Sequence, residues 1–384
     1  MRYLTALFCL LLVGSLAFAL ADPSMAYCDK MGYKSTITKT SAGETGICIV
    51  NGTSYDSWAF FQGKVGQQYS YCTKKGYDTK TQISPAPYSI PYAVCVPKKG
   101  TVKSASTTSN ITMLDLMINN RDGILGSKVS SMSVLGGATP SGVKAASISS
   151  SGALPSSFDW RNVNGSNWMT PVKNQGSWPN CFYFASAAVV EAKFNIDNKN
   201  PKLLYDLSEQ DLHTCSNSTW TFQYMKDSGV VDEACDPYAP AITTCNRCPD
   251  WKNRTAKIRD YYSVTGGPEA LKRALMQYGP ILIAIDAYDI GMPPNSWHSV
   301  ALIGWNDTGG YWIIKNSWGA GWGGNGYGKL PYNRSLEQQT GSAGYVVGQT
   351  IHPLQPHYVP EFGPLGAFVV IAGGLIIVFW RSRA

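Results

Sequence analysis

Ten cysteines constrain this chain more than any other feature, because their pairing depends on the compartment in which the chain folds. One of them, Cys9, lies in an apolar run over residues 4–20 that follows Arg2 and leads to the small residue Ala21. This pattern predicts a secretory signal peptide over residues 1–21, and an uncleaved anchor is the alternative. Either form exports the body of the protein, so we expect the remaining cysteines to form disulfides.

Composition excludes several classes of protein. With 44% hydrophobic and 15% charged residues, the chain has enough apolar material to pack one or two domains and too few charges for a long coiled coil. The 38 glycines and 22 tyrosines favour a compact α+β or β-rich body. The net charge of +7 has no dense basic run behind it, so no nucleic-acid partner is expected.

The C-terminal region predicts a membrane segment. Residues 365–380 form an uninterrupted apolar run, which predicts a transmembrane anchor over residues 364–384. Arg381 and Arg383 follow this run, which predicts that the body lies outside the cell. A buried core helix is the alternative. Residues 351–363 form a tail linker that ends in Pro-Glu-Phe-Gly. This order of elements resembles the C-terminal sorting signals that sortase-like enzymes cut in archaeal envelopes, which implies such a processing enzyme as a partner; a plain single-pass anchor explains the same residues.

Glycosylation motifs agree with a location at the cell membrane or cell surface. Seven Asn-x-Ser/Thr acceptors occur: Asn51, Asn110, Asn164, Asn217, Asn253, Asn306 and Asn333. Chance alone produces several such motifs in a chain of this length.

An internal repeat occupies residues 22–99. Tyr27-Cys28 and Gly32-Tyr33 recur 44 residues later as Tyr71-Cys72 and Gly76-Tyr77, and each unit ends in a further cysteine. Two small units with one cysteine near either end favour two disulfides, although four cysteines allow three pairings. The favoured pairs are Cys28 with Cys48 and Cys72 with Cys95.

The first unit resembles a small secreted bacterial domain that is sometimes labelled hemolysin-like. The resemblance rests on Gly46-Ile47-Cys48 and on the aromatic cluster over residues 58–61, which we expect to form core rather than a ligand surface. Residues 100–153 then become rich in Ser, Thr, Ala and Gly and predict a linker or propeptide. Within it, residues 111–118 predict a short helix, either on the surface of the linker or covering an active site before processing.

An odd number of cysteines follows Pro155. They are Cys181, Cys215, Cys235, Cys245 and Cys248. One thiol therefore stays unpaired unless another chain takes it. Cys181 is the candidate, because it lies far from the other four and opens an apolar helical pattern over residues 181–196. A thiol at a helix N-terminus is stabilised as thiolate, the form that acts as a nucleophile.

Such a nucleophile needs a proton partner, and the chain has four histidines. His352 and His357 lie in the tail, and His213 lies in a helical segment where a structural role is expected. His298 remains, within a predicted strand over residues 297–303. A histidine beside a strand is more often structural, so its neighbours decide its role.

Those neighbours resemble the papain-like cysteine proteases across residues 154–350. The matching segments in chain order are Leu154-Pro155, Asp159-Trp160-Arg161, residues 170–177 (Thr-Pro-Val-Lys-Asn-Gln-Gly-Ser), Leu207-Ser208-Glu209-Gln210, Gly279-Pro280, His298 and residues 312–319 (Trp-Ile-Ile-Lys-Asn-Ser-Trp-Gly). The resemblance implies a two-lobed α+β catalytic domain, with a helical lobe and a β-barrel-like lobe, and it implies no metal or organic cofactor.

The resemblance also implies a role for each matching residue. Cys181 attacks the scissile carbonyl, and His298 protonates the leaving amine. Asn316 orients the His298 ring, and Trp318 shields that hydrogen bond from water. Gln175 forms an oxyanion hole with the backbone N–H of Cys181.

The chain departs from the family around the cleft. Trp178, Pro179 and Asn180 stand where the family has Cys-Gly-Ser, the Gly-Cys-x-Gly-Gly segment expected after Cys215 is absent, and Trp297 borders the cleft. Substrate specificity therefore cannot be transferred.

The family pattern also bears on the remaining cysteines. The resemblance suggests a disulfide between Cys215 and Cys245, which leaves Cys235 with Cys248. Half of a zinc site at Cys245 and Cys248 is the alternative.

These features predict an exported, surface-anchored cysteine endopeptidase that hydrolyses proteins or peptides through a thioester acyl-enzyme. The alternative is a catalytically silent papain-like envelope protein that binds or adheres. A third possibility concerns residues 22–153 alone, as an inhibitor or self-inhibiting proregion.

Overall fold

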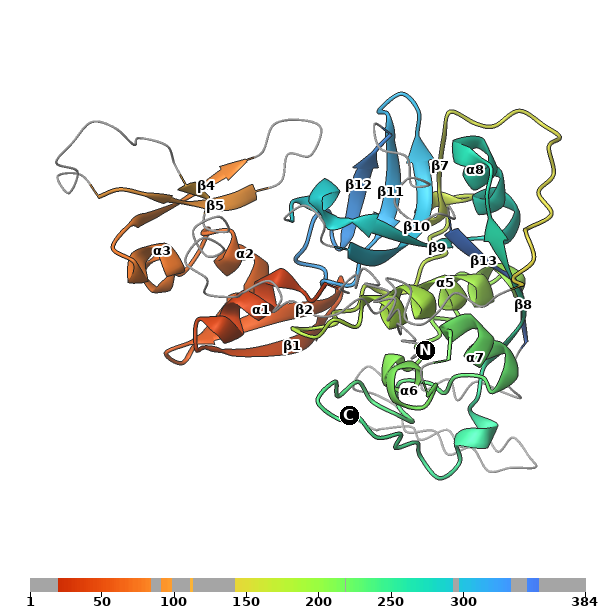
Figure 1. Ribbon diagram of the computed structural model, residues 1–384, viewed down its shortest axis with the longest axis horizontal. Helices are drawn as coiled ribbons and strands as arrows, with labels where there is room; N and C mark the ends of the chain where they lie inside the picture. Colours follow the sequence, from red (N-terminus) through yellow and green to blue (C-terminus); the bar gives the residue numbers. More distant parts are fainter. Residues whose placement is uncertain are drawn as a thin grey trace, which may run out of the picture.

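The structure is a computed structural model that describes residues 20–83, 91–98, 111–112, 142–217, 219–292, 297–332 and 344–351. Within these residues a smaller N-terminal part lies beside a larger body of helices and sheet (Figure 1). Nearly all of the predicted signal peptide, the tail linker and the predicted anchor at 364–384 lie outside the described residues. Among the helices that are described, none combines the length and apolar character needed to cross a bilayer.

The first N-terminal unit is a helix followed by a three-stranded antiparallel sheet. Helix α1 (Pro23–Lys30) starts at Asp22, whose carboxylate accepts the N–H of Ser24 and caps the helix. Strands β1 (Lys34–Thr40), β2 (Gly43–Val50) and β3 (Thr53–Asp56) pair in sequence order, and the short helix α2 (Ser57–Phe61) follows. A disulfide between Cys28 and Cys48 joins α1 to β2.

The second unit repeats this order of elements on a smaller scale. A 3₁₀ turn (Gln67–Tyr69) leads into α3 (Tyr71–Lys74), and β4 (Asp78–Ile83) pairs with β5 (Pro91–Val96). The Cys72–Cys95 disulfide joins α3 to β5. Strand β6 (Ile111–Thr112) pairs with the free edge of β5. The predicted helix at 111–118 is therefore wrong at its start, because the backbone of these two residues bonds to a sheet edge; residues 113–118 lie outside the described residues.

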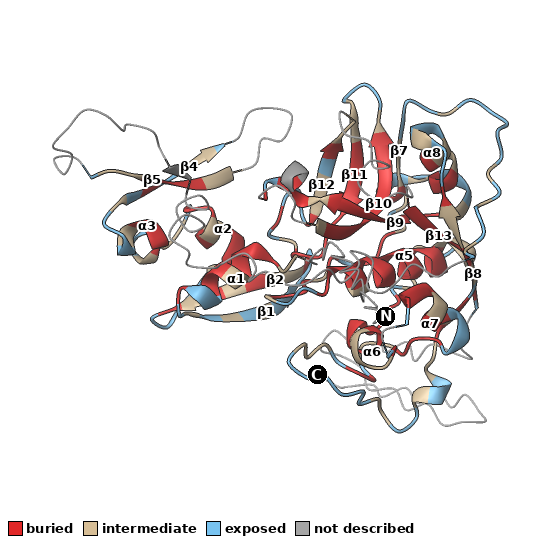
Figure 2. Ribbon diagram, viewed as in Figure 1, coloured by how far each residue is buried: buried red, intermediate tan, exposed pale blue. Residues whose placement is uncertain are grey.

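Helix α5 (Cys181–Asp197) forms the centre of the larger body. Almost every side chain along it is buried. It contacts the strands β10 (Trp297–Asn306) and β13 (Gly344–Ile351) of the large sheet and the helices α6 (Glu209–Thr214) and α7 (Thr221–Asp227). Figure 2 shows α5 as a buried element between the sheet and these helices. A helix that is apolar on all faces needs such enclosure.

The large sheet forms the other half of this body. Its strand order is β12-β11-β10-β9-β13-β8, and β7 (Ser157–Asp159) pairs with the end of β10. In chain order the strands are β8 (Lys257–Val264), β9 (Ile281–Asp286), β10 (Trp297–Asn306), β11 (Tyr311–Lys315), β12 (Tyr327–Pro331) and β13 (Gly344–Ile351). Helix α8 (Gly267–Tyr278) packs against β10 and β13. Short 3₁₀ turns occur at Trp160–Asn162, Trp251–Asn253 and Ala287–Ile290.

Residues 142–153, the end of the predicted linker, lie against the larger body. The N–H of Ala146 bonds to the carbonyl of Ser263 in β8 at 2.8 Å, and the side chain of Gln277 in α8 bonds to the carbonyl of Ser147 at 2.8 Å. The composition of this stretch is that of a linker, yet its backbone finds partners at the edge of the sheet.

Two further disulfides lie in the larger body, Cys215–Cys245 and Cys235–Cys248. The four pairs in the structure are those that the repeat and the family resemblance favoured. The zinc alternative for Cys245 and Cys248 does not hold, because both sulfurs are already bonded.

Candidate active site

Cys181 begins α5 and is the only free cysteine among the described residues. Its side chain has no exposed surface, and its sulfur accepts the backbone N–H of Ser299 at 3.4 Å. Ser299 directly follows His298 in β10, so the helix and the central strand bring together the thiol and the histidine that lie far apart in the sequence.

His298 is held in one orientation by its neighbours. Its Nε2 lies 2.6 Å from Oδ1 of Asn316, which directly follows β11. The indole of Trp318 stacks on the imidazole, with ring centroids 4.4 Å apart. The other ring nitrogen, Nδ1, has no hydrogen-bond partner among the described residues, so it remains available for proton exchange.

Burial controls the protonation of both groups. It raises the pKa of the Cys181 thiol, against the opposing effect of backbone N–H groups. It also lowers the pKa of His298 to about 4, although the hydrogen bond to Asn316 acts in the other direction. The helix position alone predicts a thiolate, but in this buried site desolvation is larger. Burial therefore favours the neutral form of both the thiol and the imidazole.

Gln175 precedes Cys181 in the chain, and hydrogen bonds hold its side chain at both the oxygen and the nitrogen. Its Oε1 accepts the hydroxyl of Ser317 at 2.7 Å. Its Nε2 donates to two backbone carbonyls, those of Leu20 and Trp178, at 2.8 Å each. An amide N–H group held in this way can stabilise negative charge on a substrate oxygen.

The residues that differ from the family lie near this amide. Trp178 is 41% exposed, and Pro179 is also exposed. Asn180 is buried, and its side chain donates to the hydroxyl of Tyr238, which in turn donates to the carbonyl of Gln175 at 2.8 Å. Asn180 therefore supports the loop, whereas Trp178 projects at the surface.

Trp297 lies at the start of β10, directly before His298, and is half-buried. Its backbone pairs with Asp286 in β9. Trp297 thus lies on the same strand as the candidate histidine, and its place at the border of a substrate cleft stays a prediction.

A largely buried ionic network supports the segment that leads to Gln175. The ammonium group of Lys173 contacts carboxylate oxygens of Glu191, Glu209 and Asp206 at 2.8–2.9 Å. Burial alone lowers the pKa of Lys173, but the carboxylates, Glu191 first, raise it well above its usual value. The lysine stays charged and ties the residues before the site to α5 and α6.

Sequence reasoning missed the N-terminal residues that contact the site. They are Leu20, Asp22, Glu44 and Trp58, and their contacts reach Gln175, Asn174, Gly176 and Trp318. Trp58 was expected in a core, and it does pack in one, but in the core of the larger body. A single sequence carries no signal for such contacts, since neither partner shows where the two parts meet.

One cluster of potential metal ligands occurs among the described residues: Asp211, Cys215 and Cys245. The two sulfurs form a disulfide, and the carboxylate of Asp211 binds Arg247. These three residues therefore do not offer a free ligand set.

Comparison with protein families identifies the larger body. The model of the papain family of cysteine proteases matches residues 154–349, just over half of the chain. The chain belongs to the papain family of cysteine proteases. The family and its α+β fold with disulfides are thus confirmed. A second model, a domain of unknown function (DUF333), matches residues 19–64 and does not test the hemolysin-like label.

Curated relatives agree with this assignment. The chain is 35% identical over 211 residues to cathepsin K of Mus musculus, covering 48% of this chain and 62% of that protein. It is also 35% identical over 211 residues to a cathepsin L-like peptidase of Aedes aegypti, covering 47% of this chain and 60% of that one. The chain thus spans about three fifths of the length of these relatives.

Solved structures include procathepsin L 3 from the larval midgut of Tenebrio molitor, at 28% identity and a TM-score of 0.45, covering 56% of this chain and 76% of that one.

Proposed function

We propose that this papain-family protein is a cysteine endopeptidase that hydrolyses peptide bonds in proteins or peptides. The arrangement of Cys181, His298 and Asn316 carries the proposal. The free thiol of Cys181 lies at a helix N-terminus and accepts a hydrogen bond from the strand that holds His298. The Nε2 of His298 lies 2.6 Å from the side-chain oxygen of Asn316. The Cys181 thiol gives its proton to the His298 imidazole, and the sulfur attacks the carbonyl carbon. The C–N bond then breaks as His298 passes this proton to the leaving amine, which leaves a thioester on Cys181. Water then hydrolyses the thioester.

Three neighbours assist this reaction in the proposal. Asn316 orients the imidazole, and Trp318 keeps water from their hydrogen bond. The Nε2–H of Gln175 stabilises the developing oxyanion, an effect worth about 2.7–4 kcal/mol for one donor. The aromatic rings of Trp178 and Trp297 border the substrate in this proposal.

The test compares histidine and cysteine variants in hydrolysis of casein and fluorogenic peptides. Because Cys181 has no exposed surface, each chain is assayed both intact and after partial trypsin digestion. We expect Cys181→Ala and His298→Ala to abolish hydrolysis. Cys181→Ala also abolishes labelling by a thiol-directed epoxide. His213→Ala is the matched control and keeps activity. Equal activity of wild type and Cys181→Ala contradicts the proposal.

The burial of the thiol favours a second candidate, a catalytically silent protein that binds envelope components. In that case wild type shows neither hydrolysis nor epoxide labelling between about pH 5 and 8, even after digestion has exposed the site. Labelling of Cys181 with turnover removes this candidate.

The location proposed is the cell surface, with the protease outside the membrane. Four disulfides support folding in an oxidising compartment. The proposed anchor at 364–384 and a sortase-like processing enzyme rest on the sequence pattern alone. The intact mass of the native protein tests both ends: a mass for residues 22–384 supports a retained anchor, and a smaller mass with a modified terminus supports processing.

A further inference from the structure

The first N-terminal unit lies directly on the candidate catalytic residues; we call residues 20–64 the covering unit. Its Trp58 ring stacks on Trp318, with centroids 5.8 Å apart, and its Nε1–H donates to the carbonyl of Trp318 at 2.9 Å. Trp58 is 3% exposed and belongs to the hydrophobic core of the protease body, not to the core of its own unit. This side chain therefore anchors the covering unit to the protease.

The position of Trp58 shows which side of the site is covered. In the proposed reaction His298 gives its proton to the leaving amine, so the leaving part of a substrate lies on the side of His298. Trp318 stacks on His298, and Trp58 stacks on Trp318. The covering unit thus lies on the leaving-group side.

The first described residues reach further, to the thiol itself. The carbonyl of Leu20 accepts the Nε2–H of Gln175 at 2.8 Å, and a backbone hydrogen bond from Leu20 also reaches the Cys181 sulfur. The N–H of Asp22 donates to the carbonyl of Gly176 at 2.9 Å. The backbone of Leu20 thus occupies the donor that a substrate carbonyl needs.

Strand β2 closes the rim beside Gln175. The N–H of Glu44 donates to the carbonyl of Val172 at 2.8 Å, and its own carbonyl accepts the N–H of Ala320 at 2.7 Å. Its carboxylate accepts the N–H of Asn174 at 2.8 Å. At Gly43 an added Cβ would lie 2.5 Å from the carbonyl oxygen of Val172, so the two backbones meet with no room for a side chain.

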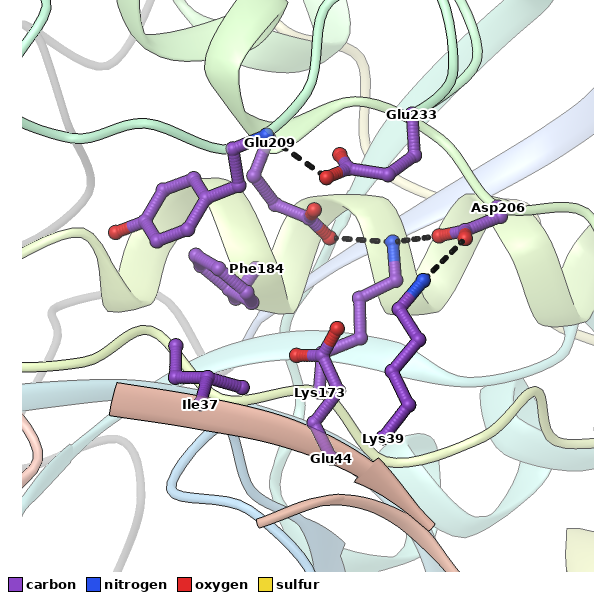
Figure 3. A pocket seen from close by; sticks show the side chains of 9 residues that line it. Ile37, Lys39, Glu44, Lys173, Phe184, Asp206, Glu209 and Glu233 are labelled. Carbon is purple, nitrogen blue, oxygen red and sulfur yellow. Dashed lines mark hydrogen bonds and ion pairs between the residues drawn. The ribbon is translucent and has the colours of Figure 1, made fainter. Parts of the chain in front are cut away.

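A cavity of about 180 Å³, lined by both charged and apolar side chains, marks the remaining gap between the two parts. Figure 3 shows Ile37 and Glu44 of the covering unit facing Phe184, Glu209 and the other protease residues that line it. An ion pair joins Lys39 to Asp206 across this boundary. The contact is therefore tight around the catalytic residues and polar beside them.

We propose that the covering unit is an inhibitor within the same chain that blocks the leaving-group side of the protease. The inference rests on the proposed peptidase function and assigns a function to the part that matches the domain of unknown function. The segment directly before the protease, residues 142–153, lies instead along β8 and α8. The block is thus supplied by a unit far upstream in the sequence.

Leu20 lies one residue before the predicted end of the signal peptide at Ala21. A chain cut after Ala21 loses the carbonyl that occupies Gln175, but it keeps the contacts of Asp22, Glu44 and Trp58. Signal-peptide removal then vacates the oxyanion position while the leaving-group side stays covered. Intact mass establishes which of the two forms each sample contains.

The experiment uses the full chain with two substrates and one thiol reagent. An internally quenched peptide of about eight residues extends to both sides of the scissile bond, whereas a short peptidyl coumarylamide leaves only the dye on the leaving-group side. Iodoacetamide reports access to Cys181 without substrate recognition. The variants are Trp58→Ala and Glu44→Ala, with Tyr92→Ala in β5 of the second unit as the control.

We expect Trp58→Ala to raise kcat/KM for the quenched peptide at least tenfold, with a smaller rise for the coumarylamide and no change in Tyr92→Ala. Glu44→Ala gives a smaller effect in the same direction and carries the test if Trp58→Ala does not fold. The proposal is overturned if wild type is active and every variant hydrolyses both substrates at the wild-type rate. If no form hydrolyses peptides but alkylation of Cys181 accelerates only in Trp58→Ala and Glu44→Ala, the cover is supported and the peptidase function fails.

Discussion

The indole N–H of Trp58 donates a hydrogen bond to the backbone carbonyl of Trp318, although 260 residues separate them in the chain. The two rings stack, and the second stacks in turn on the imidazole of His298. A small domain at one end of the chain is thereby coupled to the group proposed to move the proton.

Trp58→Phe keeps an aromatic ring on Trp318 and removes the indole N–H. One such hydrogen bond contributes about 1 kcal/mol, so we expect kcat/KM for the quenched peptide to rise roughly fivefold, less than in Trp58→Ala. Stopped-flow or plate assays of all three proteins check this order. A Phe variant as active as the Ala variant would show that the hydrogen bond, and not the ring stacking, holds the cover.

Asp22 makes the cover sensitive to pH. Its side chain is buried at the contact, and burial raises its pKa to about 7, against hydrogen bonds from Ser24 and Asn174. An exposed aspartate ionises near pH 4, so docking is strongest below that pH and weakens as pH rises to about 7. We expect the ratio of wild-type to Asp22→Asn alkylation rates at Cys181 to rise between pH 4 and 7 and then level off.

The asparagine variant suits this test, because Asn also caps a helix N-terminus. Asp29→Asn, at an exposed position of the same helix, is the control and should follow wild type. A rate ratio that does not change with pH would remove Asp22 as the titrating group.

Asn316→Ala leaves the His298 ring without its 2.6 Å partner. We expect kcat to fall about 10²-fold, the lower end of what a positioned proton donor contributes, with KM nearly unchanged. Asn306→Ala, at the far end of β10, is the control. A rise in KM at constant kcat would instead assign Asn316 to substrate binding.

Gln175→Ala removes the side-chain donor beside Cys181. The expected loss in kcat is about 10²- to 10³-fold, and the rate of Cys181 alkylation stays the same or rises, because the Leu20 carbonyl loses its partner as well. Gln223→Ala on α7 controls for general loss of stability. Unchanged kcat would mean that backbone N–H groups alone stabilise the oxyanion.

Lys173→Met leaves three carboxylates next to one another without their shared cation. Breaking a buried ion pair on one side costs about 3–5 kcal/mol, so we expect a clear drop in the free energy of unfolding and in Tm. Lys202→Met, at an exposed position, should change the free energy of unfolding by no more than about 0.5 kcal/mol and leave Tm nearly the same. Equal Tm values for both variants would show that the network contributes little.

Local patterns predicted much of the protease. The odd cysteine count identified Cys181 as the free thiol. His298 remained after the other three histidines were set aside, and the family resemblance favoured it as the proton partner. The structure brings both to one place through α5, β10 and β11. The predicted helix at 111–118 failed at its start because a short apolar pattern does not distinguish a helix from a strand that completes a sheet edge.

By itself the sequence favoured the disulfide pairs, through the repeat and the family resemblance, and it indicated the family and the candidate catalytic residues, because motifs depend on residue type and order along the chain. Only the tertiary structure showed that burial opposes ionisation of Cys181 and His298, since desolvation depends on what packs around each group. It alone also placed Trp58 on Trp318. That contact joins two units whose sequences carry no sign of each other, and it depends on surface shape that appears only after both have folded.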